Sequence, residues 1–257
     1  MASIPLSESA LASLKKSLRT EYPHVRSSHL TEALATALGH KSHAALLAYL
    51  ALAKQRDDTP DFELLDDDRF DKRLQEFGYP TDIEFSFELL LKPVPELIST
   101  MPLSAFDIEY RTVRERAWRN LMVCTINEGI HQRLFSLYPN DYRWAGYEPK
   151  KDGQVKDGCL FDFMLPIGLP ARGYVGDAGF GELSIHVAVN PNGKSVRAYN
   201  AGFDAGDVFA AGWLERETGA WLQSSTSKFN CRKSLLKPIA DIEVRPRGFG
   251  DRGRVIM

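Results

Sequence analysis

Residues 107–137 have the sequence DIEYRTVRERAWRNLMVCTINEGIHQRLFSL, and this stretch decides the fold class. Apolar side chains recur in it at spacings of three and four, in two neighbouring rows. The first row is Val113, Ala117, Leu121 and Cys124, and the second is Trp118, Met122, Ile126, Ile130 and Leu134. Two such rows form an apolar stripe wide enough for a helix in the core. We therefore expect a long central helix, capped by Asp107 or Ser104 and stopped by Pro139.

Short segments on either side of this helix have the patterns of strands and turns. Alternation in 81–89 is typical of a half-buried strand. The expected elements after the helix are strands at 160–165, 183–189 and 239–244, a Gly-rich loop at 173–181, a turn at 190–193 with a hairpin partner at 195–200, and a helix at 207–216. Together they predict an α+β fold, with a mainly antiparallel sheet packed on the long central helix.

The first 56 residues predict a basic three-helix module that precedes this domain. Ser7 is placed to cap the first helix, and Tyr22-Pro23 to end it. Ser27 or Ser28 is placed to cap the second helix. Two further residues mark helix ends: Gly39 closes the second helix, and Ser42 caps the third.

The second and third of these helices carry a resemblance to a known module. Residues 27–50, SSHLTEALATALGHKSHAALLAYL, resemble the small helical module at the N-terminus of bacterial glyoxalase-related proteins. The residues that carry it are Ser28-His29, the helix end Leu38-Gly39, and the run from Gly39 to Leu46, although His43 stands where the module is commonly aromatic. The resemblance implies a helical fold and a bacterial source, and it assigns no chemistry. The helix end is also compatible with a DNA-binding helix-turn-helix, in which Ala45 and Ala48 are smaller than usual.

An acidic connector at 57–80 is expected to join the module to an α+β domain at 81–257. Residues 57–76 hold nine Asp and Glu against three Lys and Arg, which is typical of a solvated charged segment. The spacing of a calcium loop is absent, so we expect no metal there. We expect no cofactor either.

Composition indicates a soluble protein of a reducing compartment. The net charge is -2, and no apolar run approaches the roughly 18 residues of a membrane span. The three cysteines, Cys124, Cys159 and Cys231, are far apart and lack a metal-binding spacing. We expect a cytoplasmic location, no membrane partner, and an oligomeric state that the sequence leaves open.

His186 is the leading candidate for catalysis. It shares one face of its predicted strand with Ser184, Ala188 and Asn190, while the apolar residues take the other face. A histidine on the more open face can act as a general base. Asp162 is a candidate to orient it and Tyr199 a candidate donor; the alternative is an ordinary surface histidine.

Charge at the two ends of the chain favours a different function. Residues 1–56 hold seven Lys and Arg against three Glu, and residues 228–257 hold eight Lys and Arg against three acids. The candidate nucleic-acid-binding residues are Lys15, Lys16, Arg19, Arg26, Lys41, Arg245, Arg247, Arg252 and Arg254. The Arg-Gly-Phe composition of the last residues suits phosphate and base contacts. The alternatives are a solvated tail, or a tail that folds back onto the acidic connector.

Three hypotheses about function follow from these patterns. The first is a non-catalytic bacterial binding or regulatory protein that contacts nucleic acid or a protein partner through its basic ends. The second is a hydrolase or nuclease that uses His186. The third is a structural or assembly subunit.

Overall fold

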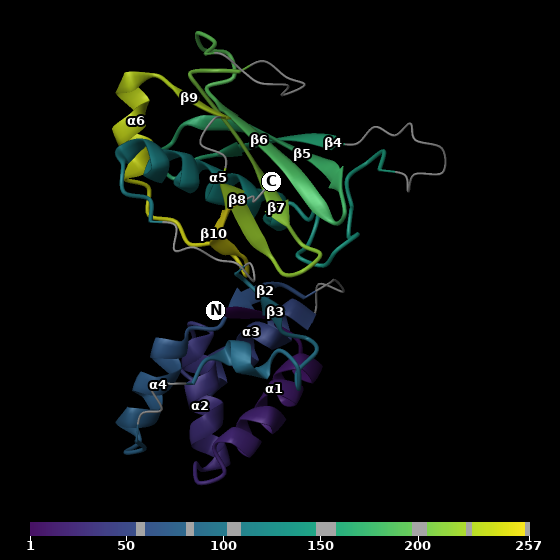
Figure 1. The fold of residues 1–257 in the computed structure, drawn as a ribbon, viewed down its shortest axis with the longest axis vertical. Coiled ribbons are helices and arrows are strands. Elements are labelled where there is room, and N and C mark those ends of the chain that lie inside the picture. Colours follow the sequence, from purple (N-terminus) through teal and green to yellow (C-terminus); the bar gives the residue numbers. More distant parts are fainter. Residues whose placement is uncertain are drawn as a thin grey trace. The chain divides into compact units, whose positions relative to one another are not determined.

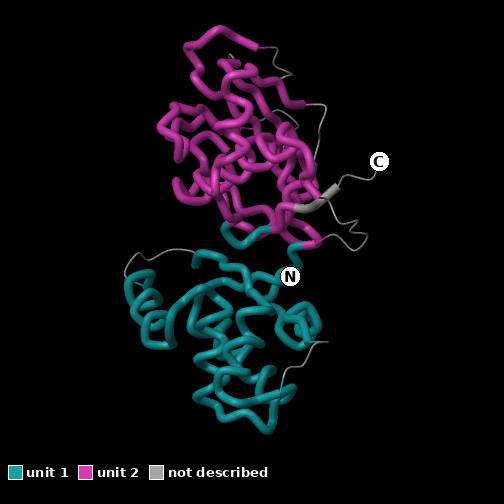
Figure 2. The backbone as a smooth tube through the Cα atoms, turned by 90° about the vertical axis from the view of Figure 1, so that its left-hand side faces the viewer, with its two compact units in different colours: residues 1–100, 247–249 teal, residues 101–246, 250–257 magenta. Residues whose placement is uncertain are grey.

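The computed structural model confirms the α+β fold and divides the chain into two compact units (Figure 1, Figure 2). Unit 1 comprises Met1–Thr100 with Arg247–Phe249, and unit 2 comprises Met101–Pro246 with Gly250–Met257. The structure describes residues 1–54, 60–80, 85–101, 109–147, 158–196, 205–224 and 228–254. Unit 1 therefore continues to Thr100, well past the predicted boundary at residue 56.

Unit 1 combines helices with a small antiparallel sheet. Its elements are β1 (Ala2–Pro5), α1 (Glu8–Glu21), α2 (Ser27–Ala37), α3 (His43–Lys54), β2 (Phe62–Leu64), α4 (Asp67–Glu76), the 3₁₀ helix η1 (Phe87–Leu90) and β3 (Ile98–Ser99). The strand order is β2-β1-β3. The three predicted helices at 1–56 are thus present, together with elements from residues 62–99.

Local capping chemistry explains where the three N-terminal helices begin and end. The hydroxyls of Ser7 and Ser42 accept hydrogen bonds from the N–H groups of Ala10 (3.2 Å) and Ala45 (3.3 Å), as predicted. Gly39 has a φ of +81°. Two backbone hydrogen bonds at the C-terminal end of α2 form a Schellman motif around it. The prediction for the start of α2 was wrong, because its N-cap is Arg26, which makes no side-chain capping bond.

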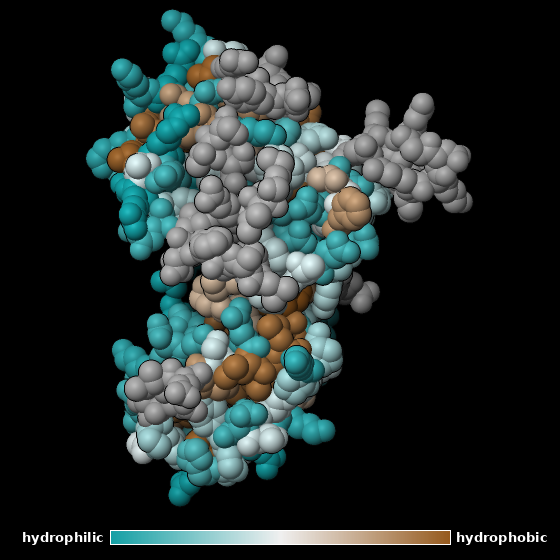
Figure 3. All heavy atoms as spheres, viewed as in Figure 1, coloured by the Kyte–Doolittle hydropathy of each residue, from teal (hydrophilic) through white to brown (hydrophobic). Residues whose placement is uncertain are grey.

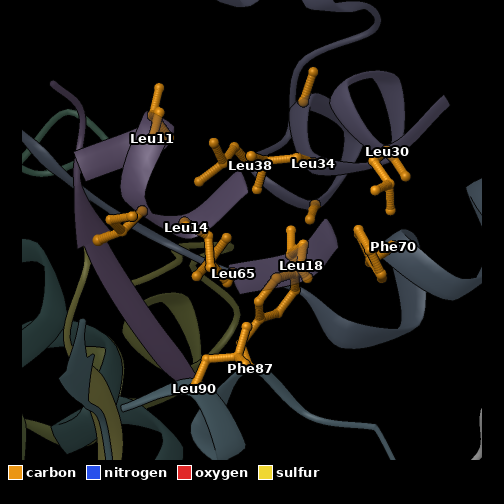
Figure 4. Packing of buried hydrophobic residues seen from close by; sticks show 14 of the residues in the cluster. Leu11, Leu14, Leu18, Leu30, Leu34, Leu38, Leu65, Phe70, Phe87 and Leu90 are labelled. Atoms are coloured by element: carbon orange, nitrogen blue, oxygen red, sulfur yellow. The ribbon is translucent and has the colours of Figure 1, made fainter. Parts of the chain in front are cut away.

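The acidic connector is part of the core of unit 1. Phe70 and Leu74, on the buried side of α4, belong to the same cluster as the leucines of α1 and α2 (Figure 4). The ring of Phe70 packs edge-on against Phe87, with 5.2 Å between centroids. The acids around these two positions give the segment its negative charge. The amphipathic spacing of Phe70 and Leu74 nevertheless allows the helix to pack in the core of unit 1.

The strand predicted at 81–89 is corrected over its described part. Residues 81–84 lie outside the described residues, and Phe87–Leu90 forms η1. The Asp67 carboxylate at the start of α4 accepts hydrogen bonds from the Ser86 hydroxyl and the Phe87 N–H, both at 3.0 Å. Because Phe85, Phe87 and Leu90 all enter one core, a tight turn here replaces the alternation of a strand.

Unit 2 is a sheet with one long helix on one face. Its elements are α5 (Val113–His131), β4 (Gly158–Met164), β5 (Pro170–Gly179), β6 (Glu182–Val189), β7 (Val208–Glu215), β8 (Trp221–Ser224), β9 (Phe229–Cys231), α6 (Lys233–Ala240) and β10 (Gly250–Arg254). The strand order is β10-β8-β7-β6-β5-β4, and β9 also pairs with β7. All pairs are antiparallel except β10 with β8.

The central helix is present but shorter than predicted. Its N-cap is Thr112, in a capping box with Glu115, whereas the predicted caps at 104 and 107 lie outside the described residues. It ends at His131 in a Schellman motif with Arg133 at a φ of +59°, before Pro139 is reached. Pro139 therefore does not end the helix, because a backbone turn ends it earlier in the chain.

One face of the sheet is buried against α5. Cross-strand register places Phe161, Val187 and Ala210 on this face. Trp118 of α5 lies over Gly212 of β7, where a Cβ would be 3.1 Å from the indole ring. The Trp118 Nε1–H donates to the Ala211 carbonyl (3.0 Å), between the segments of β7 that pair with β9 and with β8. Helix and sheet are thus joined by both packing and a buried hydrogen bond.

Three further element predictions in unit 2 were wrong. The loop at 173–181 is mostly β5, because Gly173 makes room for the Phe161 ring on the neighbouring strand. The helix at 207–216 is β7, whose two faces are both buried, so that apolar residues do not alternate with polar ones. The strand at 239–244 is the end of α6 followed by irregular chain.

The turn at 190–193 is present, with the Gly193 N–H donating to Asn190 O (2.7 Å). Its predicted partner at 195–200 lies partly outside the described residues, and 195–196 form no strand.

Candidate functional site

Predicted basic residues form a cationic surface along α1 and at the start of α2. Burial of Leu11, Leu14 and Leu18 turns the opposite side of α1 to solvent. We call the group Lys15, Lys16, Arg19 and Arg26 the α1–α2 corner. Lys16, Arg19 and Arg26 are exposed and Lys15 is half-buried. Within the described part of the chain, none of the four side chains forms an ion pair, so their charges are available to a ligand.

The end of this corner at Arg26 is held rigidly. The Arg26 N–H donates to the Tyr79 hydroxyl (3.1 Å), which is also hydrogen-bonded to His29 Nδ1 (3.0 Å). The His29 ring stacks on Phe77 at a centroid distance of 4.2 Å, and the Arg73 guanidinium lies over the same Phe77 ring, 4.7 Å from its centroid. The backbone that carries Arg26 is thereby fixed against the end of α4.

Lys41, predicted to act with these residues, lies apart from them. It is exposed in the turn after α2, whereas Arg26 is the N-cap of the same helix. The 11 residues of α2 span about 16 Å at 1.5 Å per residue. Lys41 therefore extends the basic surface along α2 but is not a member of the corner.

Two of the cations near the C-terminus take part in ion pairs. Arg232 forms an ion pair with Asp207 (2.6 Å), and Lys237 one with Asp241 (2.5 Å). The backbone carbonyl of Arg245 accepts a hydrogen bond from the Asn127 side chain of α5 (2.8 Å), while the Arg245 side chain is exposed. Nothing is described of the side chains of Arg252 and Arg254.

The segment 247–249 is folded onto the acidic connector. Gly248 has a φ of +77°, and a Cβ there would lie 2.5 Å from the Cβ of Phe62 on β2. Burial raises the pKa of the neighbouring Glu63, and the charge of Arg247 opposes that rise. Phe249 is fully buried. Of the alternatives for this end of the chain, the fold-back onto the connector is the one that the geometry matches.

His186 is paired with a serine that the sequence placed on the same face. Its Nε2 is 3.0 Å from the Ser184 Oγ, and its side chain is only 8% exposed. The rings of Tyr174 and Phe209 lie 5.4 and 6.0 Å from the imidazole, measured between centroids. The histidine is thus a buried residue whose contact to the half-buried Ser184 is polar.

The structure does not bring Asp162 to His186. Asp162 is paired across the β4–β5 ladder with Arg172, which binds both carboxylate oxygens (2.7 and 2.8 Å) and holds the pKa of the Asp162 carboxyl below its ordinary value. His186 lies on β6, two strands away, which corresponds to about 9–10 Å. Asp162 cannot orient the imidazole at that distance. Tyr199 lies outside the described residues.

A polar cluster at the start of β6 was missed by sequence reasoning. The Gln223 amide donates to the carboxylates of Glu182 and Glu215. Burial and the nearby Glu215 raise the pKa of Glu182. The three residues come from β6, β7 and β8, so only strand pairing brings them together.

Arg216 is a second feature without a sequence signal. It is 1% exposed, and its guanidinium donates to the carbonyls of Gly181 (2.9 Å), Ser136 (2.8 Å) and Asp141 (3.0 Å). It lies over the Tyr142 ring at 5.0 Å, and burial raises the pKa of Tyr142 to about 12. Three loops are joined by this side chain, which makes its role structural.

Comparison with known proteins gives no assignment for any of these surfaces. No family model, curated protein or solved structure matches the chain. Over the described ranges, no three or more His, Cys, Asp or Glu side chains are grouped to hold a metal ion. None of the helices described here is long and apolar enough to cross a membrane.

Proposed function

We propose that this chain is a non-catalytic binding protein whose α1–α2 corner contacts a polyanion, with nucleic acid as the class of partner. The observation that supports this proposal is the set of four basic side chains without ion pairs among the described residues, on one side of α1 and at the start of α2. Glu21 is the single acid in the stretch from Lys15 to Arg26. Local charge at the corner is therefore positive although the whole chain is at -2.

Polyelectrolyte behaviour gives this proposal a quantitative form. Each phosphate that a Lys or Arg neutralises releases condensed counterions, so affinity falls with salt at a slope of about 0.9 per contact on duplex DNA and about 0.7 on single strands. Four contacts at the corner correspond to a slope of roughly 3 to 4. No base-reading side chains are invoked, so we expect weak sequence preference.

The test is fluorescence anisotropy of mixed DNA and RNA oligomers at several salt concentrations, with full-length protein. Replacement of Lys15, Lys16 and Arg19 by Gln is expected to weaken binding at low salt and to reduce the salt slope by roughly 2 to 3. The matched control replaces Lys92, Lys233 and Lys237, all exposed and all outside the corner, with the same change in net charge. Equal losses in both triple variants, or no binding by the wild type at low salt, would contradict the proposal.

A hydrolase that uses His186 remains a second candidate, and one observation favours it. The Ser184 Oγ lies within hydrogen-bond distance of His186 Nε2, the arrangement in which an imidazole takes the proton of a serine nucleophile. The test is labelling by a serine-reactive fluorophosphonate, followed by mass spectrometry of the β6 peptide. Labelling at Ser184 that is lost in His186→Gln supports this function, and unlabelled wild-type protein counts against it.

A further inference from the structure

Four aromatic side chains lie next to the α1–α2 corner, and we call them the ring cluster. His24 belongs to the turn between α1 and α2, His29 lies in the first turn of α2, and Phe77 and Tyr79 closely follow α4. In Figure 1 the turn between α1 and α2 is at the lower end of unit 1. The surface there is mainly hydrophilic (Figure 3), so these rings occur among polar and charged groups.

Contacts between the rings make the cluster one connected group. Tyr79 is at its centre, with its ring edge-on to those of His24 and His29 at centroid distances of 6.2 and 5.7 Å. His29 in turn stacks on Phe77, with 4.2 Å between the centroids and 10° between the ring planes. Because the Tyr79 hydroxyl also accepts a hydrogen bond from the Arg26 N–H (3.1 Å), the cluster is joined to the backbone that carries a cation of the corner.

His24 is the member of the ring cluster that a ligand reaches most easily. Its side chain is exposed, whereas the other three are half-buried. Its ring is 6.3 Å from that of Tyr22, measured between centroids, and Tyr22 is 5% exposed and belongs to the core of unit 1. An exposed ring that is supported in this way can stack on a planar ligand with little loss of conformational entropy.

The charges around the ring cluster favour an anionic ligand. The α1–α2 corner supplies four cations that form no ion pair among the described residues. Glu76, at the end of α4, is ion-paired with Arg73 (2.6 Å), which reduces its repulsion of an anion, and Glu21 is the acid within the corner. Exposed cations beside aromatic rings are the combination with which proteins bind single-stranded nucleic acids, because the cations contact phosphates while the rings stack on bases.

Base pairing decides which form of nucleic acid can use the rings. In a duplex, internal bases are stacked on one another, so a protein in a groove meets only base edges and the backbone. An unpaired base presents its face, and its stacking on an aromatic side chain contributes about 1–3 kcal/mol. The cations of the corner contact the phosphates of both forms. The ring cluster therefore adds affinity for single strands alone.

We propose that the α1–α2 corner and the ring cluster together bind single-stranded nucleic acid, with phosphates at the basic side chains and an unpaired base stacked on His24. This inference rests on the proposed function, which it narrows from nucleic acid in general to single strands. Stacking accepts every base because each base has a π face, so weak sequence preference is still expected.

An abasic oligomer separates the contribution of the rings from that of the charges. Fluorescence anisotropy at low salt compares a mixed-sequence single strand, an abasic strand of the same length and the duplex of the same sequence, each with full-length protein. The intact single strand is expected to bind about fivefold or more tightly than the abasic strand, which has the phosphates but lacks the bases. Equal affinities for these two strands would overturn the inference and leave polyanion binding standing. If the wild type binds none of the three probes, the proposed function itself is contradicted, and the inference with it.

Substitution of His24 tests the stacking residue. His24→Ala is expected to weaken binding of the intact single strand about fivefold, and to change binding of the abasic strand and of the duplex less than about twofold. His24→Tyr, which keeps an aromatic ring, is expected to restore the affinity. Phe180→Ala is the matched control, because Phe180 is an 87% exposed aromatic residue of unit 2. Equal losses for all three probes, no loss in His24→Ala, or a His24→Tyr variant as weak as His24→Ala would overturn the stacking role of His24.

Discussion

The two basic ends of the chain have similar charge but opposite structural fates. At the N-terminal end, the basic side chains of the α1–α2 corner point to solvent and form no ion pair among the described residues. At the C-terminal end, Arg232 and Lys237 are paired with acids, and Arg119 of α5 binds the Val244 carbonyl and the Asp251 carboxylate. Formal charge along a sequence therefore does not distinguish a cation available to a ligand from one that the fold already uses.

The neighbours of each end explain this difference. α1 turns its apolar face inward, and Lys16 and Arg19 on its other side are exposed. The C-terminal segment runs beside the polar side of α5, where Arg119, Asn120 and Asn127 offer donors to its backbone. Because a buried backbone carbonyl needs a hydrogen-bond partner, such donors fix the chain that passes them. Four predictions measure how much stability such groups provide; three have a control variant at an exposed site, and the fourth is controlled by a comparison of two pH values.

Arg216→Met should produce the largest effect. The substitution leaves two buried carbonyls and the part-buried Asp141 carbonyl without their donor, and it is expected to lower the free energy of unfolding of unit 2 by about 3 kcal/mol. All four tryptophans lie in unit 2, so urea unfolding followed by tryptophan fluorescence reports on it. Arg172→Met, at an exposed ion pair, should cost less than about 1 kcal/mol. Equal effects of the two variants would contradict the structural role of Arg216.

Gly248→Ala should destabilise unit 1 by about 2 kcal/mol. A Cβ at this position meets Phe62, and the positive φ adds strain. Gly78→Ala has a similar φ of +84° with nothing within 4 Å, so it isolates the conformational cost of about 1 kcal/mol. Far-UV circular dichroism should register the loss through the helices of unit 1. If both variants lose the same stability, segment 247–249 does not pack on β2 in solution.

Arg119→Gln should cost unit 2 about 1–2 kcal/mol. Its guanidinium binds Asp251 (2.6 Å) and the Val244 carbonyl (2.8 Å), with the side chains of both charged partners less than one fifth exposed. Arg111→Gln is the control, because Arg111 is 80% exposed in its pair with Glu109 and should contribute less than about 0.5 kcal/mol. The comparison is made by urea titration with tryptophan fluorescence. A loss confined to Arg111→Gln would reverse the assignment of engaged and available cations.

Glu63→Gln should have the smallest effect, and its sign should depend on pH. Burial raises the pKa of Glu63 in the folded state, so ionisation opposes folding as pH rises through the ordinary value of 4.5 and above it. A neutral Gln avoids this loss, and the variant is expected to be more stable than wild type at pH 7 by less than about 1 kcal/mol. At pH 4 the difference should vanish. Thermal unfolding followed at 222 nm at both pH values measures it, and a variant that is less stable at pH 7 would indicate a net favourable pair with Arg247.

Local patterns predicted the elements whose signals are contained in a few neighbouring residues. The caps Ser7 and Ser42, the glycine at the end of α2 and the turn at 190–193 were all found where expected. Elements whose identity depends on partners were mistaken. β7 lacks alternation because α5 covers one of its faces, and Gly173 lies in β5 because the Phe161 ring needs the space. Neither partner is near in sequence.

The candidate sites divide in the same way. Periodicity of two was enough to place Ser184 and His186 on one face, and their contact follows from that spacing. Whether His186 and Asp162 meet depends on the order of the strands in the sheet. In the structure, Asp162 is bound by Arg172 instead. The buried Arg216 and the Gln223 cluster join residues from separate strands and loops, so no local signal marks them.

By itself, the sequence determined the fold class, the three N-terminal helices and the surplus of positive charge at both ends. These features depend on side-chain periodicity and capping, which act over a few residues. Only the tertiary structure decided that the acidic connector is core, that segment 247–249 belongs to unit 1, and that Arg232 and Lys237 are ion-paired while the α1–α2 corner forms no ion pair among the described residues. The physical reason is that burial and pairing are properties of neighbours in space, and most of these neighbours are more than 50 residues apart in the chain.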